Sequence, residues 1–181
     1  MKEIYVLLTC TATAFSRAIR YVTGSEFTHS SIALDINCSN MFSFARRQMF
    51  PPLPAGFVRE DISTGILGKY AHCSCALYRI PVDRATYDRI AEELHQMEKI
   101  QEYYQYNCFG PFFCLFRIPY HSQAKFFCSE FVAEMLHKHG AIRLDRPSSL
   151  MRPNDFVFNE DLSLVYRGTL RGLTRRIRQN S

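Results

Sequence analysis

One cysteine stands where the expected local structure suits thiol chemistry. Cys128 begins an amphipathic segment, residues 128–139, that predicts a helix ending at Gly140. Because the thiolate is the nucleophile and the positive end of a helix dipole lowers a cysteine pKa, this position favours an activated thiol. Unpaired N–H groups in the same first turn can also stabilise an oxyanion. The structural alternative is a core cysteine, since Cys128 shares a helix face with Phe131 and Met135.

A histidine early in the chain is the matching base. His29 opens an alternating segment, residues 29–35, that predicts a strand with Ile32 and Leu34 on one face. A base on a rigid strand can be held within hydrogen-bond reach of a thiol on a helix. Taken alone, His29 also fits a half-exposed residue at a strand end. The combination of His29 with Cys128 is what makes a Cys–His pair the preferred hypothesis.

Other polar residues are secondary candidates. His121 precedes Cys128 by seven residues and is a candidate for a position in the cleft. Glu60 and Asp61 are candidates for binding a substrate amine, although nothing in the sequence requires it. His95, His137 and His139 are interpreted as structural or solvated.

The periodicity of the chain predicts the elements around these residues. Further strands are expected at residues 4–9, 41–46, 57–60, 73–80 and 162–170, and helices at residues 15–22 and after Asp83, which is the expected N-cap. Strands grouped near the start and the end, with helices between them, favour an α+β fold.

An aromatic segment separates the central helix from the Cys128 helix. Residues 107–120 contain many Phe and Tyr side chains and are expected to be a long loop. Loops of this length usually carry function or cover something. The side chains are suited to lining an apolar cleft beside the nucleophile, but such a cluster more often fills a core.

The length and the net charge of the chain limit its domain organisation and its possible partners. The chain of 181 residues predicts one domain over residues 1–170 and a basic C-terminal tail over residues 171–181. Five arginines and no acid lie in the last fifteen residues, which accounts for the net charge of +5. A nucleic-acid partner is not expected, because a basic tail alone is usually solvated. Weak contact of this tail with an anionic membrane surface stays an alternative.

The cysteines indicate the compartment. Seven cysteines without paired spacing argue against a disulfide framework, and no CxxC motif is present. We therefore expect reduced thiols, a cytoplasmic location, no metal and no cofactor. The apolar run at residues 4–8 is too short for a signal sequence or a membrane span.

Five segments occur in the order found in a known family. They are Thr28-His29-Ser30-Ser31-Ile32-Ala33-Leu34-Asp35, Met41-Phe42-Ser43-Phe44, Gly56-Phe57-Val58, Phe127-Cys128-Ser129-Glu130-Phe131-Val132 and Arg152-Pro153-Asn154-Asp155-Phe156. In these segments the chain resembles the circularly permuted NlpC-type papain-like superfamily, the YiiX-like cysteine hydrolases related to lecithin:retinol acyltransferase.

The resemblance implies a fold, a reaction and three site residues. The implied fold is an antiparallel sheet packed against the helix that bears the nucleophile. Cys128 matches the nucleophile, His29 the base and Ser43 the third, orienting residue, where the family commonly has a His, a Glu or a similar polar group. A serine brings no charge to stabilise an imidazolium, and a shift of one residue in the hairpin would turn Ser43 away.

Three functions follow from this resemblance. The first is a cysteine peptidase or amidase that cleaves a small peptide-like substrate, such as a muropeptide fragment or an amino-acid conjugate. The second is a lipid acyl hydrolase or acyltransferase at a membrane surface. The third is a degenerate binding module, which the unusual Ser43 motivates.

Overall fold

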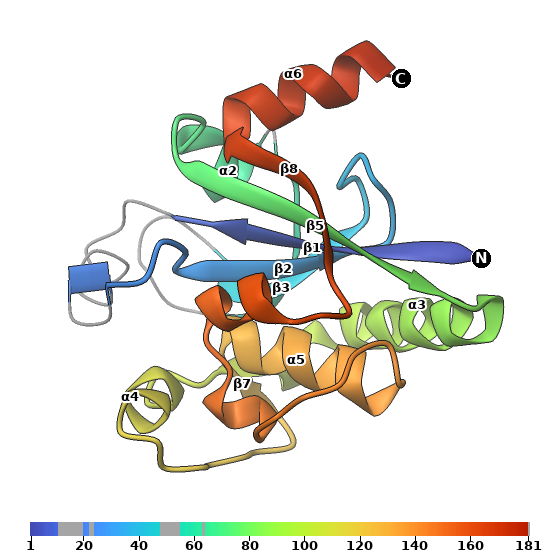
Figure 1. The fold of residues 1–181 in the computed structure, drawn as a ribbon. Helices are drawn as coiled ribbons and strands as arrows, with labels where there is room; N and C mark the ends of the chain where they lie inside the picture. The colour runs from blue at the N-terminus through green and yellow to red at the C-terminus, as the bar shows by residue number, and fades with distance from the viewer. Residues whose placement is uncertain (11–19, 22–23, 48–54, 63, 181) are drawn as a thin grey trace.

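The structure is a computed structural model that describes residues 1–10, 20–21, 24–47, 55–62 and 64–180 (Figure 1). The helix predicted over residues 15–22 lies almost wholly outside these ranges. None of the helices within them has the length and apolar character needed to cross a membrane.

Eight strands of the described chain form one sheet, in the order β7-β6-β4-β3-β2-β1-β5-β8. The strands are β1 (Lys2–Thr9), β2 (His29–Ala33), β3 (Met41–Arg46), β4 (Ala55–Glu60), β5 (Ser74–Val82), β6 (Gln105–Tyr106), β7 (Lys125–Phe126) and β8 (Ser163–Thr169). Neighbouring strands are antiparallel except β6 and β7, which are parallel. The predicted α+β class is confirmed, but the sheet is mixed and not wholly antiparallel.

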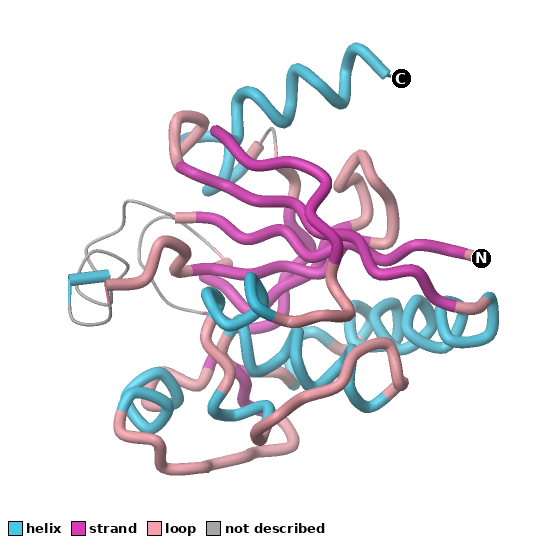
Figure 2. The backbone as a smooth tube through the Cα atoms, in the orientation of Figure 1, coloured by secondary structure: helices cyan, strands magenta, loops and turns pink. Residues whose placement is uncertain are grey.

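Helices cover both faces of this sheet (Figures 1 and 2). They are α2 (Gly65–Lys69), α3 (Arg84–Lys99), α4 (Gly110–Leu115), α5 (Cys128–Lys138) and α6 (Leu170–Asn180), with short 3-10 helices at Gln101–Tyr103, Ser148–Leu150 and Pro153–Phe158. α3 and α5 pack on one face, and α2 and α6 contribute to the apolar cluster on the other. The sheet is therefore the middle layer, and α5 has a complete apolar face to pack against.

Aromatic packing fixes α5 on the sheet. Phe131 of α5 lies with its ring centroid 5.1 Å from that of Phe44 and 5.6 Å from that of Phe57. All three side chains are almost completely buried. Since burial of one such side chain contributes on the order of 2 kcal/mol, this cluster holds the first turn of α5 against β3 and β4.

The predicted central helix is confirmed as α3. Its N-cap is Asp83, whose carboxylate accepts a hydrogen bond from the Thr86 N–H at 2.7 Å. Ile90, Leu94 and Met97 of its apolar stripe are buried. The 3.6-residue period therefore identified both the helix and the face that it buries.

The aromatic segment differs from its prediction. Residues 107–120 include the helix α4, and several of their aromatic side chains point to solvent, with Phe109 exposed by 72% and Phe116 by 70%. The interpretation of this cluster as core filling is therefore wrong. The physical reason is that α4 buries only a narrow face, at Gly110 and Cys114.

The basic end of the chain is also ordered. Residues 171–181 were expected to be a tail, whereas α6 continues from β8 and spans all but the last of them. Leu170 and Leu173 are buried in the apolar cluster opposite α5, and the arginines at 171, 175, 176 and 178 are exposed. Amphipathic packing, which charge counting does not reveal, holds this segment on the sheet.

Candidate active site

Short strands fix the position of the first turn of α5. The Asn107 N–H, just after β6, donates to the Phe126 carbonyl of β7 at 2.9 Å. Phe127 then adopts an extended conformation as the N-cap of α5, and its N–H donates to Glu130 Oε2 at 3.4 Å. Cys128 is thus the first helical residue, as the sequence predicts, and is 6% exposed.

The histidine lies where two strands separate. β2 and β3 pair at residues 32–33 and 41–42, whereas β2 begins earlier, at His29. α5 packs against both strands near this opening. The Cys128 thiol and the His29 ring lie close enough there for each to shift the pKa of the other. The structure therefore brings together the two residues that the sequence paired.

A carboxylate engages the other side of the His29 ring. Glu60, the last residue of β4, has both carboxylate oxygens 3.2 Å from His29 Nε2. Ser31 Oγ donates to Glu60 Oε2 at 2.5 Å and lies 3.3 Å from the same ring nitrogen. The side chains form a connected series from Cys128 through His29 to Glu60.

The electrostatics of this series favour a thiolate and an imidazolium. Burial raises the pKa of the Cys128 thiol, but the hydrogen bond and charge of His29, with the backbone N–H groups of Ser30 and Ser129, lower it below its ordinary value. Burial lowers the pKa of His29, but the charge of Glu60 and hydrogen bonds to Cys128 and Glu60 bring it well above its usual range. Burial likewise raises the pKa of Glu60, but the charge of His29 and the hydrogen bonds to His29 and Ser31 together outweigh it, so that the carboxyl is more acidic than usual.

Four other thiols, which are buried or partly buried, behave in the opposite way. All seven cysteines are free thiols. Burial raises the pKa of Cys38 and of Cys75 to about 12, and that of Cys73 and of Cys114 to about 11. Burial alone therefore deactivates a thiol in this fold, and Cys128 differs because it has a cationic partner.

The chain was compared with protein-family models, with curated proteins and with solved structures. None of them matches it. The description of the site accordingly rests on its own geometry.

The residue expected to orient His29 is not in contact with it. Extending the β2–β3 register places Ser43 opposite Ser31, two residues from His29. Among the described residues the Ser43 hydroxyl has no hydrogen-bond partner of ordinary geometry, although it lies close enough to Glu60 to favour the ionised carboxylate. Glu60, and not Ser43, makes the hydrogen-bond contact with the imidazole among the described residues, and the orienting role expected of Ser43 stays a prediction.

Glu60 was considered in the sequence only as a group for binding an amine. Its contact with His29 was missed in the sequence because the carboxylate lies on β4, the strand next to β3, where Glu60 pairs with Met41. Its longer side chain reaches across that strand to His29. Asp61, the other acidic candidate, lines a neighbouring surface cavity together with Arg46 and Lys69. Its predicted role toward a substrate amine stays a prediction.

A phenol and several N–H groups lie near the nucleophile. Burial and the nearby groups Cys128, Cys108 and Glu130 raise the pKa of Tyr106 well above its usual range. The phenol therefore keeps its proton and can act as a hydrogen-bond donor. Together with the N–H groups of Ser30 and Ser129 beside the Cys128 sulfur, it gives the site donors for a developing oxyanion.

His121 lies against a buried carboxyl group. Its Nδ1 is 3.5 Å from Glu130 Oε1, and its ring centroid is 5.7 Å from that of Phe126. The Glu130 side chain is fully buried. Burial raises the pKa of Glu130 to about 8, an effect that the Phe127 N–H opposes and the charge of Glu134 reinforces. The carboxyl of Glu130 is thus mostly protonated at neutral pH.

This buried acid predicts a pH-dependent stability. The pKa of Glu130 in the folded state is raised to about 8. Below the pKa that the group has in the unfolded chain, the free energy of unfolding is unaffected, and it falls as the pH rises from there toward about 8. Glu130→Gln keeps the shape and removes the ionisation. We expect this variant to be more stable than the parent at pH 8, by on the order of 3 kcal/mol, and nearly equal to it at pH 4. Urea unfolding at both pH values measures the difference.

An exposed substitution is the matched control for that experiment. Glu92→Gln on α3 makes the same chemical change at the surface and should alter stability little at either pH. A stabilisation by Glu130→Gln that is the same at pH 4 and pH 8 would show that Glu130 is ionised normally in the folded protein.

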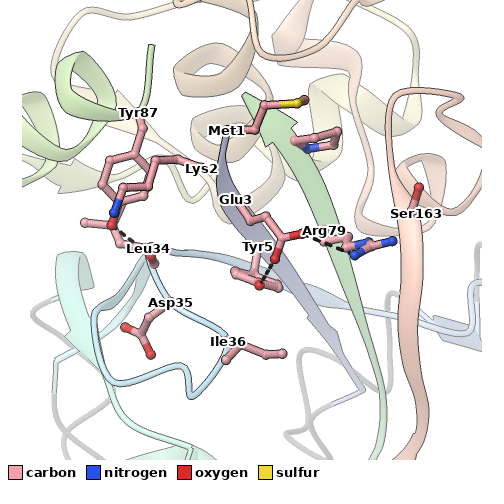
Figure 3. Close-up of a pocket in the computed structure, with 11 residues that line it drawn as sticks. Met1, Lys2, Glu3, Tyr5, Leu34, Asp35, Ile36, Arg79, Tyr87 and Ser163 are labelled. Carbon is pink, nitrogen blue, oxygen red and sulfur yellow. Dashed lines mark hydrogen bonds and ion pairs between the residues drawn. The ribbon is translucent and has the colours of Figure 1, made fainter. Parts of the chain in front are cut away.

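A second concave region lies away from this site. Residues from β1, β5 and α3 line it, including Lys2, Glu3, Arg79 and Tyr87 (Figure 3). Arg79 pairs with Glu3 at 3.2 Å, and Lys2 lies over the Tyr87 ring. These charged groups therefore already have partners within the protein. Within the described residues, no cluster of three or more His, Cys, Asp or Glu could hold a metal ion.

Proposed function

We propose that this chain is a cysteine-dependent hydrolase of amide bonds with the permuted papain-like fold of the NlpC type. The observation that supports it most is the Cys128 thiol in contact with a His29 ring whose Nε2 is held by Glu60. A nucleophile, a base and an anionic orienting group in this order are the arrangement that activates a thiol.

The reaction follows from the charges of the pair. The Cys128 thiolate attacks the carbonyl carbon and forms a carbon–sulfur bond, while the carbonyl electrons move to its oxygen. N–H groups of the first turn of α5 stabilise that oxyanion. His29 gives its proton to the leaving amine as the carbon–nitrogen bond breaks. A water then gives a proton to His29, attacks the thioester and releases the acid and the thiolate.

The contact with Glu60 bears on the alternatives. The degenerate binding module was motivated by an uncharged orienting residue, and a carboxylate against His29 removes that motive. A small peptide-like or amino-acid conjugate stays the preferred substrate class. A lipid acyl group is a second candidate, which the exposed aromatic side chains of α4 favour.

A covalent intermediate is the sharpest test of this proposal. Incubation with a panel of acyl-amino-acid and peptidyl aminocoumarin amides should release the fluorophore and, after acid quenching, leave an acyl group on the peptide that contains Cys128. Cys128→Ala should lose both signals, and Cys108→Ala should retain them. Turnover that persists in Cys128→Ala would overturn the mechanism.

A further inference from the structure

The outward face of α4 is apolar, which is the reverse of an ordinary surface helix. Gly110 and Cys114 face the protein, and side chains on the opposite arc face solvent. Six exposed large side chains define what is here called the α4 surface: Phe109, Phe112, Leu115, Phe116, Ile118 and Tyr120. Single exposed apolar residues are ordinary, but six within twelve positions mark an interaction surface.

The charges within the segment that carries the α4 surface have one sign. Between Glu102 and Glu130 the sequence contains no Asp or Glu. Arg117 and Lys125 lie in this interval, and both are exposed. Bulky aromatic side chains accompanied by cations are the composition that binds the interface of an anionic bilayer.

The backbone conformation of Arg117, just after α4, supports a functional role for its positive charge. Arg117 has a φ of 58°, in the left-handed region that favours glycine. Its N–H donates to the Cys114 carbonyl, and the Ile118 N–H donates to the Phe113 carbonyl at 2.9 Å, which completes a Schellman motif. An arginine at this position strains the backbone and holds a cation between Phe116 and Ile118.

The α4 surface is tied to the nucleophile. A Cβ on Gly110 would lie 2.5 Å from the Phe127 ring, so the start of α4 packs directly on the residue before Cys128. The Asn107 amide oxygen accepts the Gly110 N–H at 2.9 Å. α6, which carries the arginine-rich face, lies at the opposite end of the molecule (Figure 1). A membrane bound at α4 would therefore meet the side of the protein near Cys128.

We propose that the α4 surface docks the protein on anionic lipid membranes. The aromatic side chains enter the interfacial region, and Arg117 and Lys125 contact lipid headgroups. This goes beyond the proposed hydrolase function, because docking requires neither Cys128 nor His29. It also replaces the C-terminal arginines as the expected membrane contact.

Vesicle co-sedimentation tests this docking with the full chain. The protein should bind phosphatidylcholine vesicles that contain phosphatidylserine and bind pure phosphatidylcholine vesicles more weakly. The double variant Phe112→Glu/Phe116→Glu should weaken binding by about tenfold or more, since each buried aromatic is worth roughly 1.5–3 kcal/mol of transfer free energy. Arg117→Gly should weaken it by about fivefold, the effect of one cation near a charged bilayer, while raising the melting temperature.

Three control variants establish whether the α4 surface itself is the membrane contact. Leu164→Glu introduces the same kind of charge at an exposed apolar residue of β8, at the other edge of the sheet, and should bind like the parent. Arg171→Glu/Arg175→Glu should also retain binding. Cys128→Ala should bind normally, so that failure of the catalytic proposal and failure of docking are distinguishable.

Specific outcomes would overturn the proposal. Loss of binding in the α6 variant with retention in the Phe112/Phe116 variant would place the membrane contact on α6. Absence of binding to any vesicle, with a parent dimer that the Phe112/Phe116 variant converts to monomer, would show that a second copy covers the α4 surface.

Discussion

His29→Ala is expected to slow alkylation of Cys128 at pH 6.5 by about 10²-fold. In the parent, the cationic His29 keeps the pKa of Cys128 below its ordinary value, so the thiol is ionised to a greater extent than an ordinary cysteine. Without that cation, a thiol with a pKa of about 8.5 or higher is ionised to about 1% or less at this pH. The rate of iodoacetamide labelling, read at the Cys128 peptide by mass spectrometry, measures the change directly.

The histidine at position 121 is the matched control for this substitution. His121→Ala removes a partly exposed ring that contacts Glu130 and not Cys128, and it should leave the labelling rate within about threefold of the parent. Equal labelling of the parent and His29→Ala at pH 6.5 would show that the pair is not assembled in solution. Circular dichroism of both variants checks that the fold is retained.

Glu60→Gln is expected to slow Cys128 labelling at pH 6.5 by about tenfold to a hundredfold. The carboxylate raises the pKa of His29, and the resulting cation lowers the pKa of Cys128. A charged partner at this distance shifts a pKa by about 1–2 units, and Gln keeps the shape while losing the charge. Labelling of the variant should recover as the pH is raised toward 9, where the thiol ionises without help.

Two neighbouring substitutions identify which group orients His29. Ser43→Ala should change the labelling rate by less than about threefold, because its hydroxyl does not hydrogen-bond the imidazole. Asp61→Asn removes the adjacent acid and should also have little effect. A loss in Ser43→Ala as large as in Glu60→Gln would restore Ser43 to the role that the sequence predicted.

The sequence predicted the elements well where the periodicity was strong. The α3 stripe, the strand that carries His29 and the helix that begins at Cys128 each have a pattern that determines both the element and its buried face. The contact between Cys128 and His29 followed because each residue stands at the end of a rigid element. Two such residues come into contact once one helix packs correctly on one strand.

The orienting residue was less predictable because it depends on register and reach. Ser43 lies on the expected strand, at a position opposite Ser31, and its hydroxyl makes no hydrogen bond to the ring among the described residues. Glu60 lies one strand farther away, and no local pattern indicates that a longer side chain crosses β3. Register and side-chain length are tertiary properties that the linear sequence does not display.

The α4 surface was unpredictable for a different reason. An apolar stripe indicates that a helix buries one face, but not what covers that face. The sheet covers Phe131, whereas Phe112 and Phe116 are exposed to solvent. The same composition thus produced a core in one segment and an interaction surface in the other.

The pH dependence of alkylation at each of the seven cysteines tests the central claim most directly. The hydrogen bond and charge of His29 and two backbone N–H groups lower the pKa of Cys128, so the inflection of its labelling should lie below the ordinary cysteine pKa of about 8.5. Cys38, Cys73, Cys75 and Cys114, whose pKa values burial raises, should label slowly throughout that range. An inflection for Cys128 at pH 8.5 or above would contradict an activated thiol and with it the proposed hydrolase.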